Sequence, residues 1–257
     1  FNASTFNNRG GLFASSSAFD FDGGTGHINC GDGASLDNIF DGGGTVEAWI
    51  KADGDAETGS GMRPINKDQW FIGIDNATGD FYKLRLYYFW SGANPSWTTT
   101  NIELTRHKWH HFAVTYDADA VANNPTIYID GKMVPVTQNA APDPATTRDS
   151  DVGYDLRIGD RADGIRTFNG PIAMVRMWSD TRTAAEIRAN MFNQYSDMAS
   201  TTGLVGMWQF DEGEGGTVAD VSTSGNTGTI TFGSSAWATG GTWTAGNILS
   251  STGELYI

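Results

Sequence analysis

The densest group of side chains that could bind a ligand lies in residues 80–97, DFYKLRLYYFWSGANPSW, which contain seven aromatic rings. Successive side chains of a β-strand point to opposite faces of its sheet, so the stretch divides into two sets. The set that contains the leucines is predicted to pack in the core: Tyr82, Leu84, Leu86, Tyr88 and Trp90. The other set mixes two cations with rings, which is unusual for plain solvent exposure: Phe81, Lys83, Arg85, Tyr87 and Phe89.

Four residues of this stretch are therefore candidates for ligand contact. Tyr87 and Phe89 offer ring faces on the mixed side of the strand, and Trp97 follows in the loop that we expect after it. Arg85 can donate paired hydrogen bonds to hydroxyl or carboxylate groups. Trp97 has an alternative role, because a ring at this position can equally close the core.

Residues that could do catalysis do not form a convincing pattern. The acidic group Asp211, Glu212 and Glu214 is interrupted by glycines within 213–216, which indicates a turn rather than the stiff frame that a catalytic pair needs. His110 and His111 point to opposite faces of a strand and have no acid or cysteine at a metal-binding spacing. We therefore expect that the protein is not an enzyme.

Composition excludes several other classes. The chain of 257 residues has 16 basic and 30 acidic residues and a net charge of −14, so binding to nucleic acid or anionic lipid is not expected. It contains no apolar run of 18 residues, so membrane insertion is not expected either. Cys30 is the only cysteine, which rules out an intrachain disulfide.

The elements that must position these residues are mostly strands. Apolar and polar residues alternate in many short runs separated by Gly, Asp and Asn, such as TVEAWIKAD (45–53), QWFIGID (69–75) and HHFAVTYD (110–117). The pair Asp130-Gly131 between two such runs predicts a two-residue hairpin. Thr183 and Glu186 predict a capping box that begins one short helix. The pattern indicates an all-β sandwich.

Five phrases together resemble a known family. FDFDGGTGHINCGDG, TVEAWIKAD, KWHHFAVTYD, PTIYIDGKMV and FNGPIAMVRMWSDTRTAAEIRAN are similar in order and spacing to the laminin-G-like domain of the concanavalin A-like lectin/glucanase superfamily, over roughly residues 11–195. The resemblance implies an antiparallel jelly-roll β-sandwich with one short helix. We expect the laminin-G-like domain in residues 1–200 and a C-terminal β extension in residues 201–257.

The resemblance also implies a ligand class and a metal. The mixed face of residues 81–89 would be either a groove in which sugars stack on rings or a surface covered by another chain, so Arg85, Tyr87, Phe89 and Trp97 would bind a glycan. Calcium sites of the superfamily combine aspartates with backbone carbonyls. At a position where related domains often have an acidic residue, this chain has Ala173. The remaining metal candidates are Asp20, Asp22, Asp53, Asp55 and Glu57, together with the pair Asp75 and Asp80. The Glu-x-Asp-x-x-Glu pattern of the superfamily's hydrolases is absent.

The C-terminal residues leave three arrangements open. LVGMWQFDEGEGGTVADVSTSGNTGTI resembles the segment that leads into a jelly roll, and NILSSTGELYI (247–257) resembles a further opening strand. The chain could be part of a tandem array, the tail could fold back on its own sandwich, or it could pair with another copy by strand addition. We expect a non-catalytic, glycan-binding protein of a cell, extracellular or virion surface; the alternative is a structural subunit of a virion or surface filament.

Overall fold

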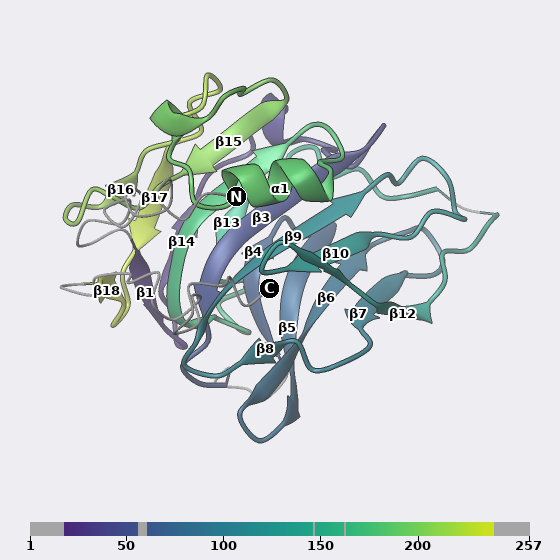
Figure 1. Cartoon of the computed structure of the whole chain (residues 1–257), viewed down its shortest axis with the longest axis horizontal. Coiled ribbons are helices and arrows are strands. Elements are labelled where there is room, and N and C mark those ends of the chain that lie inside the picture. The colour runs from purple at the N-terminus through teal and green to yellow at the C-terminus, as the bar shows by residue number, and fades with distance from the viewer. Residues whose placement is uncertain (1–17, 56–60, 146, 162, 239–257) are drawn as a thin grey trace, which may run out of the picture.

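The computed structural model describes residues 18–55, 61–145, 147–161 and 163–238, and in this part the chain forms a sandwich of two antiparallel β-sheets (Figure 1). This all-β architecture is consistent with a jelly roll, so the fold class predicted from the sequence is confirmed.

The first sheet has the strand order β11-β10-β9-β3-β14-β1-β18, with β15 also paired to β14. Its strands are β1 (Phe19–Asp22), β3 (Gly44–Lys51), β9 (Trp109–Tyr116), β10 (Thr126–Ile129), β11 (Lys132–Val134), β14 (Asn169–Trp178), β15 (Leu204–Trp208) and β18 (Ala236–Trp237).

The second sheet has the order β12-β7-β6-β5-β4-β13-β2-β17-β16, with β8 also paired to β6. Its strands are β2 (His27–Asn29), β4 (Met62–Asn66), β5 (Trp70–Thr78), β6 (Phe81–Tyr88), β7 (Ser96–Thr99), β8 (Leu104–Thr105), β12 (Val136–Ala140), β13 (Arg157–Ile158), β16 (Thr217–Val218) and β17 (Gly228–Thr231).

The main hydrophobic core lies between the two sheets, and β6 shows how the sequence builds it. Leu84 and Leu86 are fully buried in that core, whereas Lys83, Arg85 and Tyr87 keep part of their surface exposed. Each buried leucine contributes roughly 1.5–3 kcal/mol relative to an exposed one. The alternation that divides residues 81–88 into two faces is therefore confirmed.

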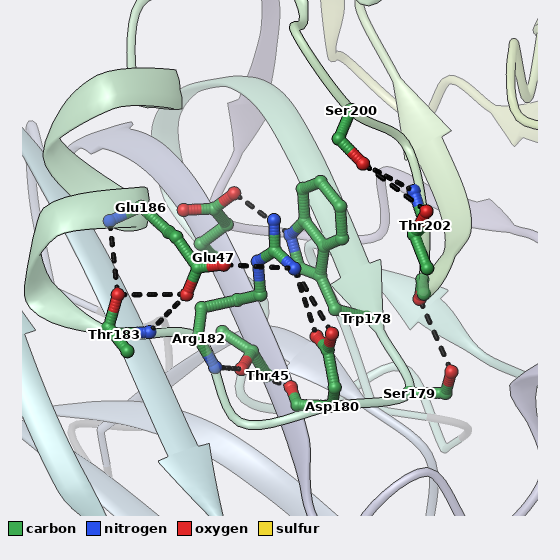
Figure 2. Close-up of polar contacts among 11 residues, drawn as sticks. Thr45, Glu47, Trp178, Ser179, Asp180, Arg182, Thr183, Glu186, Ser200 and Thr202 are labelled. Atoms are coloured by element: carbon green, nitrogen blue, oxygen red, sulfur yellow. Dashed lines mark hydrogen bonds and ion pairs between the residues drawn. The ribbon is translucent and has the colours of Figure 1, made fainter.

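The helix α1 (Ala184–Asn190) covers the outer face of the first sheet (Figure 1). Its predicted capping box is present: Thr183 Oγ1 accepts a hydrogen bond from the Glu186 N–H at 3.3 Å, and Glu186 Oε2 accepts one from the Thr183 N–H at 2.8 Å (Figure 2). Ile187 packs from the helix onto Tyr128 of β10. Two short 3₁₀ helices, Ala34–Leu36 and Tyr195–Asp197, complete the described helical structure.

A buried charge network lies in the same outer face. The Glu47 carboxylate accepts a hydrogen bond from Trp178 Nε1 at 3.0 Å (Figure 2), and it lies 3.3 Å from Arg176 Nη1 and 3.3 Å from His111 Nε2. Burial opposes the charge of Glu47, but Arg176, His111 and Trp178 outweigh it and lower the pKa of Glu47 to about 2. The side chains of this network come from β3, β9 and β14, so the network links these three strands.

The local turn signals also hold. Asp130 and Gly131 have φ angles of 52° and 74°, as a type I′ turn requires, and they join β10 to β11. Between β12 and β13, Asp151 is fully buried, where it binds Lys67 Nζ at 3.2 Å and Trp70 Nε1 at 2.7 Å.

The described part of the C-terminal extension folds back on the same sandwich: β15 pairs with β14, β17 with β2 and β18 with β1. Residues 239–257, including the predicted strand 247–257, lie outside the described residues, so pairing between copies through them stays a prediction. No helix in the described chain has the length and apolar character needed to cross a membrane.

Candidate functional site

Three aromatic rings form a row on the outer face of the second sheet. β5 pairs with β6 so that Phe71 lies directly opposite Tyr87. Their ring centroids are 5.0 Å apart and the planes differ by 12°, which is a stacked pair. Phe89, just beyond β6, places its ring 5.0 Å from that of Tyr87. Phe71 is 7% exposed, while Tyr87 and Phe89 are partly exposed, so the row presents ring surface to solvent.

An arginine extends this row. The guanidinium carbon of Arg63 in β4 lies 3.6 Å from the centroid of the Phe71 ring, a cation–π contact. The ring packs closely against Gly73, where a Cβ atom would lie 3.2 Å from Phe71 Cε2. Arg63 itself is 8% exposed, and its Nη1 donates to Asn66 Oδ1 at 2.9 Å. A strongly buried charge thus borders the aromatic row.

The described loop residues 159–161 and 163–168 form one wall beside Arg63. The ends of this loop are joined by a hydrogen bond from the Phe168 N–H to the Gly159 oxygen at 2.7 Å. It is attached to β4 at two further points, from the Gly159 N–H to the Pro64 oxygen and from the Arg63 N–H to the Arg166 oxygen, both at 2.9 Å. These bonds hold the backbone of the loop against the sheet.

Together these elements enclose a hollow of about 520 Å³, called here the aromatic hollow. It is lined by Arg63, Asp68, Phe71, Arg85, Tyr87, Phe89, Tyr154, Arg161, Asp163 and Arg166. Apolar rings with a few convergent polar groups are typical of small-molecule sites.

A second hollow of about 780 Å³, called here the threonine hollow, adjoins the first and shares Arg85 with it. Hydroxyl and amide groups from β7, β12 and the loop after β7 dominate its lining, to which β5 and β6 add charged side chains. The lining residues are Asp75, Lys83, Arg85, Thr98, Thr99, Thr100, Asn101, Ile102, Thr137 and Asn139. The strand register places Arg85 opposite Thr98, and Thr98 opposite Thr137. The two hollows follow one another across β5, β6, β7 and β12.

Arg85 is fixed where the hollows meet. Its Nη2 lies 2.5 Å from Asp75 Oδ2, and its Nε donates to Thr98 Oγ1 at 3.4 Å. Burial raises the pKa of Asp75, while Arg85 acts in the opposite direction. The ion pair holds the Arg85 side chain and leaves it 34% exposed at the surface.

The structure brings three of the four predicted ligand contacts, Arg85, Tyr87 and Phe89, into one hollow, and excludes the fourth. Trp97 lies in β7 instead of a loop, and it is fully buried in the core. Its Nε1 donates to Asn124 Oδ1 at 2.7 Å, and its ring lies 5.1 Å from that of Tyr116. Trp97 has no surface left for a ligand and is not part of the candidate site.

Sequence reasoning missed several lining residues. Phe71 carries a usable signal, since the alternation of QWFIGID puts Trp70 and Ile72 on the core side and Phe71 outside. Its pairing with Tyr87 depends on the strand register, which that pattern does not specify. Arg161 and Arg166 come from a loop without periodicity and carried no signal.

The aspartates predicted to bind calcium have other partners. Asp22 shapes a turn: its Oδ1 accepts hydrogen bonds from the N–H groups of Gly24 and Gly26 at 2.9 and 3.1 Å, and its Oδ2 accepts one from the Ser234 N–H at 2.8 Å. Burial works against ionisation, yet these bonds lower the pKa of Asp22. Both oxygens are thus already engaged.

Asp53 and Asp55 lie beside positive or positively chargeable groups. Asp53 is 3.1 Å from Lys51 Nζ and 2.8 Å from His107 Nδ1, and Asp55 is 2.6 Å from Arg106 Nη2. A calcium ion at either carboxylate would lie beside a group that already compensates the charge of that carboxylate.

The remaining metal candidates do not complete a site. Burial, followed by repulsion from Asp53, raises the pKa of Asp20. Glu57 lies outside the described residues. Among the residues that are described, no group of three His, Cys, Asp or Glu side chains could hold a metal ion. The described aspartates form no such group, and calcium binding stays a prediction that rests on the resemblance.

The residues considered for catalysis line neither hollow. Glu212 Oε1 accepts a hydrogen bond from the Ala219 N–H at 2.7 Å, and burial raises the pKa of Glu212. His110 Nδ1 lies 2.8 Å from Asp130 Oδ2, next to the hairpin turn.

Comparison with known proteins gives a family and a fold. A family model described as concanavalin A-like lectin/glucanases superfamily, the laminin G type, matches residues 22–188, which is more than half of the chain. Among curated proteins, none matches the sequence.

Three solved structures are similar to this chain at low sequence identity. A Bacteroides ovatus protein, provisionally described as carbohydrate-binding, has a TM-score of 0.61 and 20% identity over 88% of this chain. The match spans 60% of that protein's length. A heptameric SAP-like pentraxin from Limulus polyphemus has a TM-score of 0.47, with 12% identity and coverage of 69% and 81% of the two chains. The CBM40 of the Ruminococcus gnavus IT-sialidase has a TM-score of 0.45 and 13% identity, and the match covers 69% of this chain and 97% of that one.

Proposed function

Because the chain belongs to the laminin G-like family of the concanavalin A-like lectin/glucanases superfamily, we propose that it binds glycans, without catalysis, in the aromatic hollow. One observation carries this proposal: the partly exposed row of Phe71, Tyr87 and Phe89 beside fixed polar groups. The C–H face of a sugar ring packs against aromatic surface, and its hydroxyl groups need donors and acceptors nearby.

The threonine hollow supports a ligand longer than one sugar. It continues from Arg85 and presents hydroxyl and amide groups, including the contact between Thr100 Oγ1 and Thr137 Oγ1 at 2.9 Å and the bond from Asn139 Nδ2 to Thr98 Oγ1 at 2.6 Å. Hydroxyls of a second sugar unit could exchange into such bonds. The proposed ligand is an oligosaccharide that crosses β6.

Binding without turnover agrees with the state of the two carboxylates in the aromatic hollow. Asp163 is paired with Arg161 at 3.3 Å, and Asp68 Oδ1 accepts a hydrogen bond from Asn66 Nδ2 at 3.1 Å. Glycoside hydrolysis needs one carboxylic acid and one carboxylate free to face the scissile bond. The proposed setting is a cell, extracellular or virion surface, where a glycan receptor meets its ligand.

The proposal is tested with an oligosaccharide array, followed by titration calorimetry on the best ligand. Tyr87→Ala and Phe89→Ala should each weaken binding about tenfold or more, which corresponds to about 1.4 kcal/mol. Phe81→Ala is the matched control, because Phe81 is an exposed ring on the same face of β6 that lines neither hollow. Absence of any glycan ligand, or equal losses for Tyr87→Ala and Phe81→Ala, would refute this site. Release of shorter sugars would refute the non-catalytic part.

A further inference from the structure

The aromatic hollow has a charge opposite to that of the whole chain. Four arginines and two aspartates line it, although the chain carries 16 basic against 30 acidic residues. Screening limits the reach of the surrounding negative charge to about 8 Å at physiological ionic strength. A group seated among the arginines therefore experiences mainly the local positive field.

Three of the four arginines differ in the groups that surround them. Arg161 has Asp163 at 3.3 Å, and Arg85 has Asp75 at 2.5 Å. Arg63, in contrast, is 8% exposed, donates to a neutral amide through Nη1, and its Nε has no hydrogen-bond partner. Burial of a charge without full hydrogen bonding is costly.

Like charges add to this cost. Burial first, and then the proximity of Arg161 and Arg166, lower the pKa of Arg63 to about 10, although Asp163 and Asp68 act in the opposite direction, so the side chain is still charged at neutral pH. An anion placed between these three guanidinium groups would relieve their repulsion. A planar or tetrahedral oxyanion would also match the paired donors of arginine.

We propose that the aromatic hollow selects a saccharide bearing a carboxylate or sulfate group, with the anion beside Arg63, Arg161 and Arg166 and the sugar ring on Tyr87 and Phe89. This inference rests on the proposed function and specifies its ligand class. The net charge of −14 disfavours a densely charged polymer such as a nucleic acid, whose phosphates would continue beyond the hollow. The ligand is thus one with isolated acidic groups.

The test compares probes that differ by a single group. One pair is a trisaccharide ending in glucuronic acid and the same trisaccharide ending in glucose. The other is a galactose trisaccharide with and without a 6-sulfate. A thymidine octanucleotide serves as the phosphate probe. The wild-type protein should bind at least one acidic probe about tenfold or more tightly than its neutral partner, and this preference should fall as salt increases.

Variants then locate the preference. Arg161→Gln and Arg166→Gln should each reduce the ratio of acidic to neutral affinity about five- to tenfold. Arg166→Gly is a second variant suited to the fold, since Arg166 has a φ of 66°, a conformation that favours glycine. The matched control is Arg188→Gln, which removes the same charge from an exposed position on α1 and should leave the ratio unchanged.

The outcomes separate the two proposals. Equal binding of acidic and neutral probes overturns the acidic ligand but leaves glycan binding intact. A lack of binding to every saccharide overturns both. Binding of the octanucleotide as tight as that of the acidic sugars, or an unchanged ratio in both glutamine variants, also overturns this inference.

Discussion

Replacing Glu47 by Gln removes the only carboxylate in the buried network beneath α1 while keeping the shape of the side chain. Glu47 is 1% exposed, and its carboxylate lies next to Arg176, His111 and Trp178. The Arg176 guanidinium would then keep the Asn193 carbonyl oxygen as a hydrogen-bond partner but lose its counter-charge. Breaking a buried ion pair from one side typically costs about 3–5 kcal/mol.

The pKa of Glu47 gives a second value for the stability that this carboxylate contributes. It falls from 4.5 to about 2 on folding, and this shift corresponds to about 3 kcal/mol of stability at neutral pH. Since the folded pKa is the lower one, the contribution is complete above pH 4.5 and is lost as the pH falls toward 2. At pH 3 the same relation leaves about 1 kcal/mol of this contribution.

Urea denaturation of the wild type and Glu47→Gln at pH 7 and pH 3 measures both values. We expect the variant to be about 3–4 kcal/mol less stable at pH 7, with the difference falling by about 2 kcal/mol at pH 3. Glu214→Gln, at an exposed position, is the control and should change stability by less than about 0.5 kcal/mol. A Glu47→Gln effect below about 1 kcal/mol at pH 7, or one equal at both pH values, would refute the reasoning.

Four further predictions follow from the same structure. Burial raises the pKa of Asp160 from 3.8 to about 6, so its ionisation destabilises the fold as the pH rises through 6. Asp160→Asn should therefore be more stable than wild type by up to about 3 kcal/mol at pH 8 and no more stable at pH 3.5. Urea titrations that show no pH-dependent gain in stability would contradict this. Trp97→Phe should lower the free energy of unfolding by about 1–3 kcal/mol but leave glycan affinity within about twofold, as measured by calorimetry; a stable variant that no longer binds would return Trp97 to the site. If calcium binds as the resemblance implies, exchange of EDTA for 1 mM calcium, which is roughly the upper end of the dissociation constants of extracellular modules, should raise Tm by several degrees at a tight site; a Tm unchanged within about 1 °C would contradict calcium binding. Removal of residues 239–257 should not change the elution volume in size-exclusion chromatography, because the described C-terminal strands pair within the chain; dissociation of an oligomer on truncation would support strand exchange between copies.

The sequence alone determined the features that depend on near neighbours in the chain. Alternation over residues 81–88 decides which side chains of β6 face the core, because a strand turns successive residues to opposite sides. The Thr183–Glu186 capping box and the Asp130-Gly131 turn likewise follow from contacts within a few residues. The sandwich fold and the outward position of Arg85, Tyr87 and Phe89 could therefore be predicted.

Only the tertiary structure decided which distant residues meet. The register between β5 and β6 stacks Phe71 on Tyr87, and the hydrogen bond from Arg63 to the Arg166 oxygen brings a loop without sequence signal to the edge of the site. The order of the strands likewise places the Trp97 side chain in the core. Such contacts depend on the order and register of strands that are far apart in the chain, and local propensity contains no information about either. The positive charge of the aromatic hollow arises in the same way, from arginines that only the fold gathers within an acidic chain.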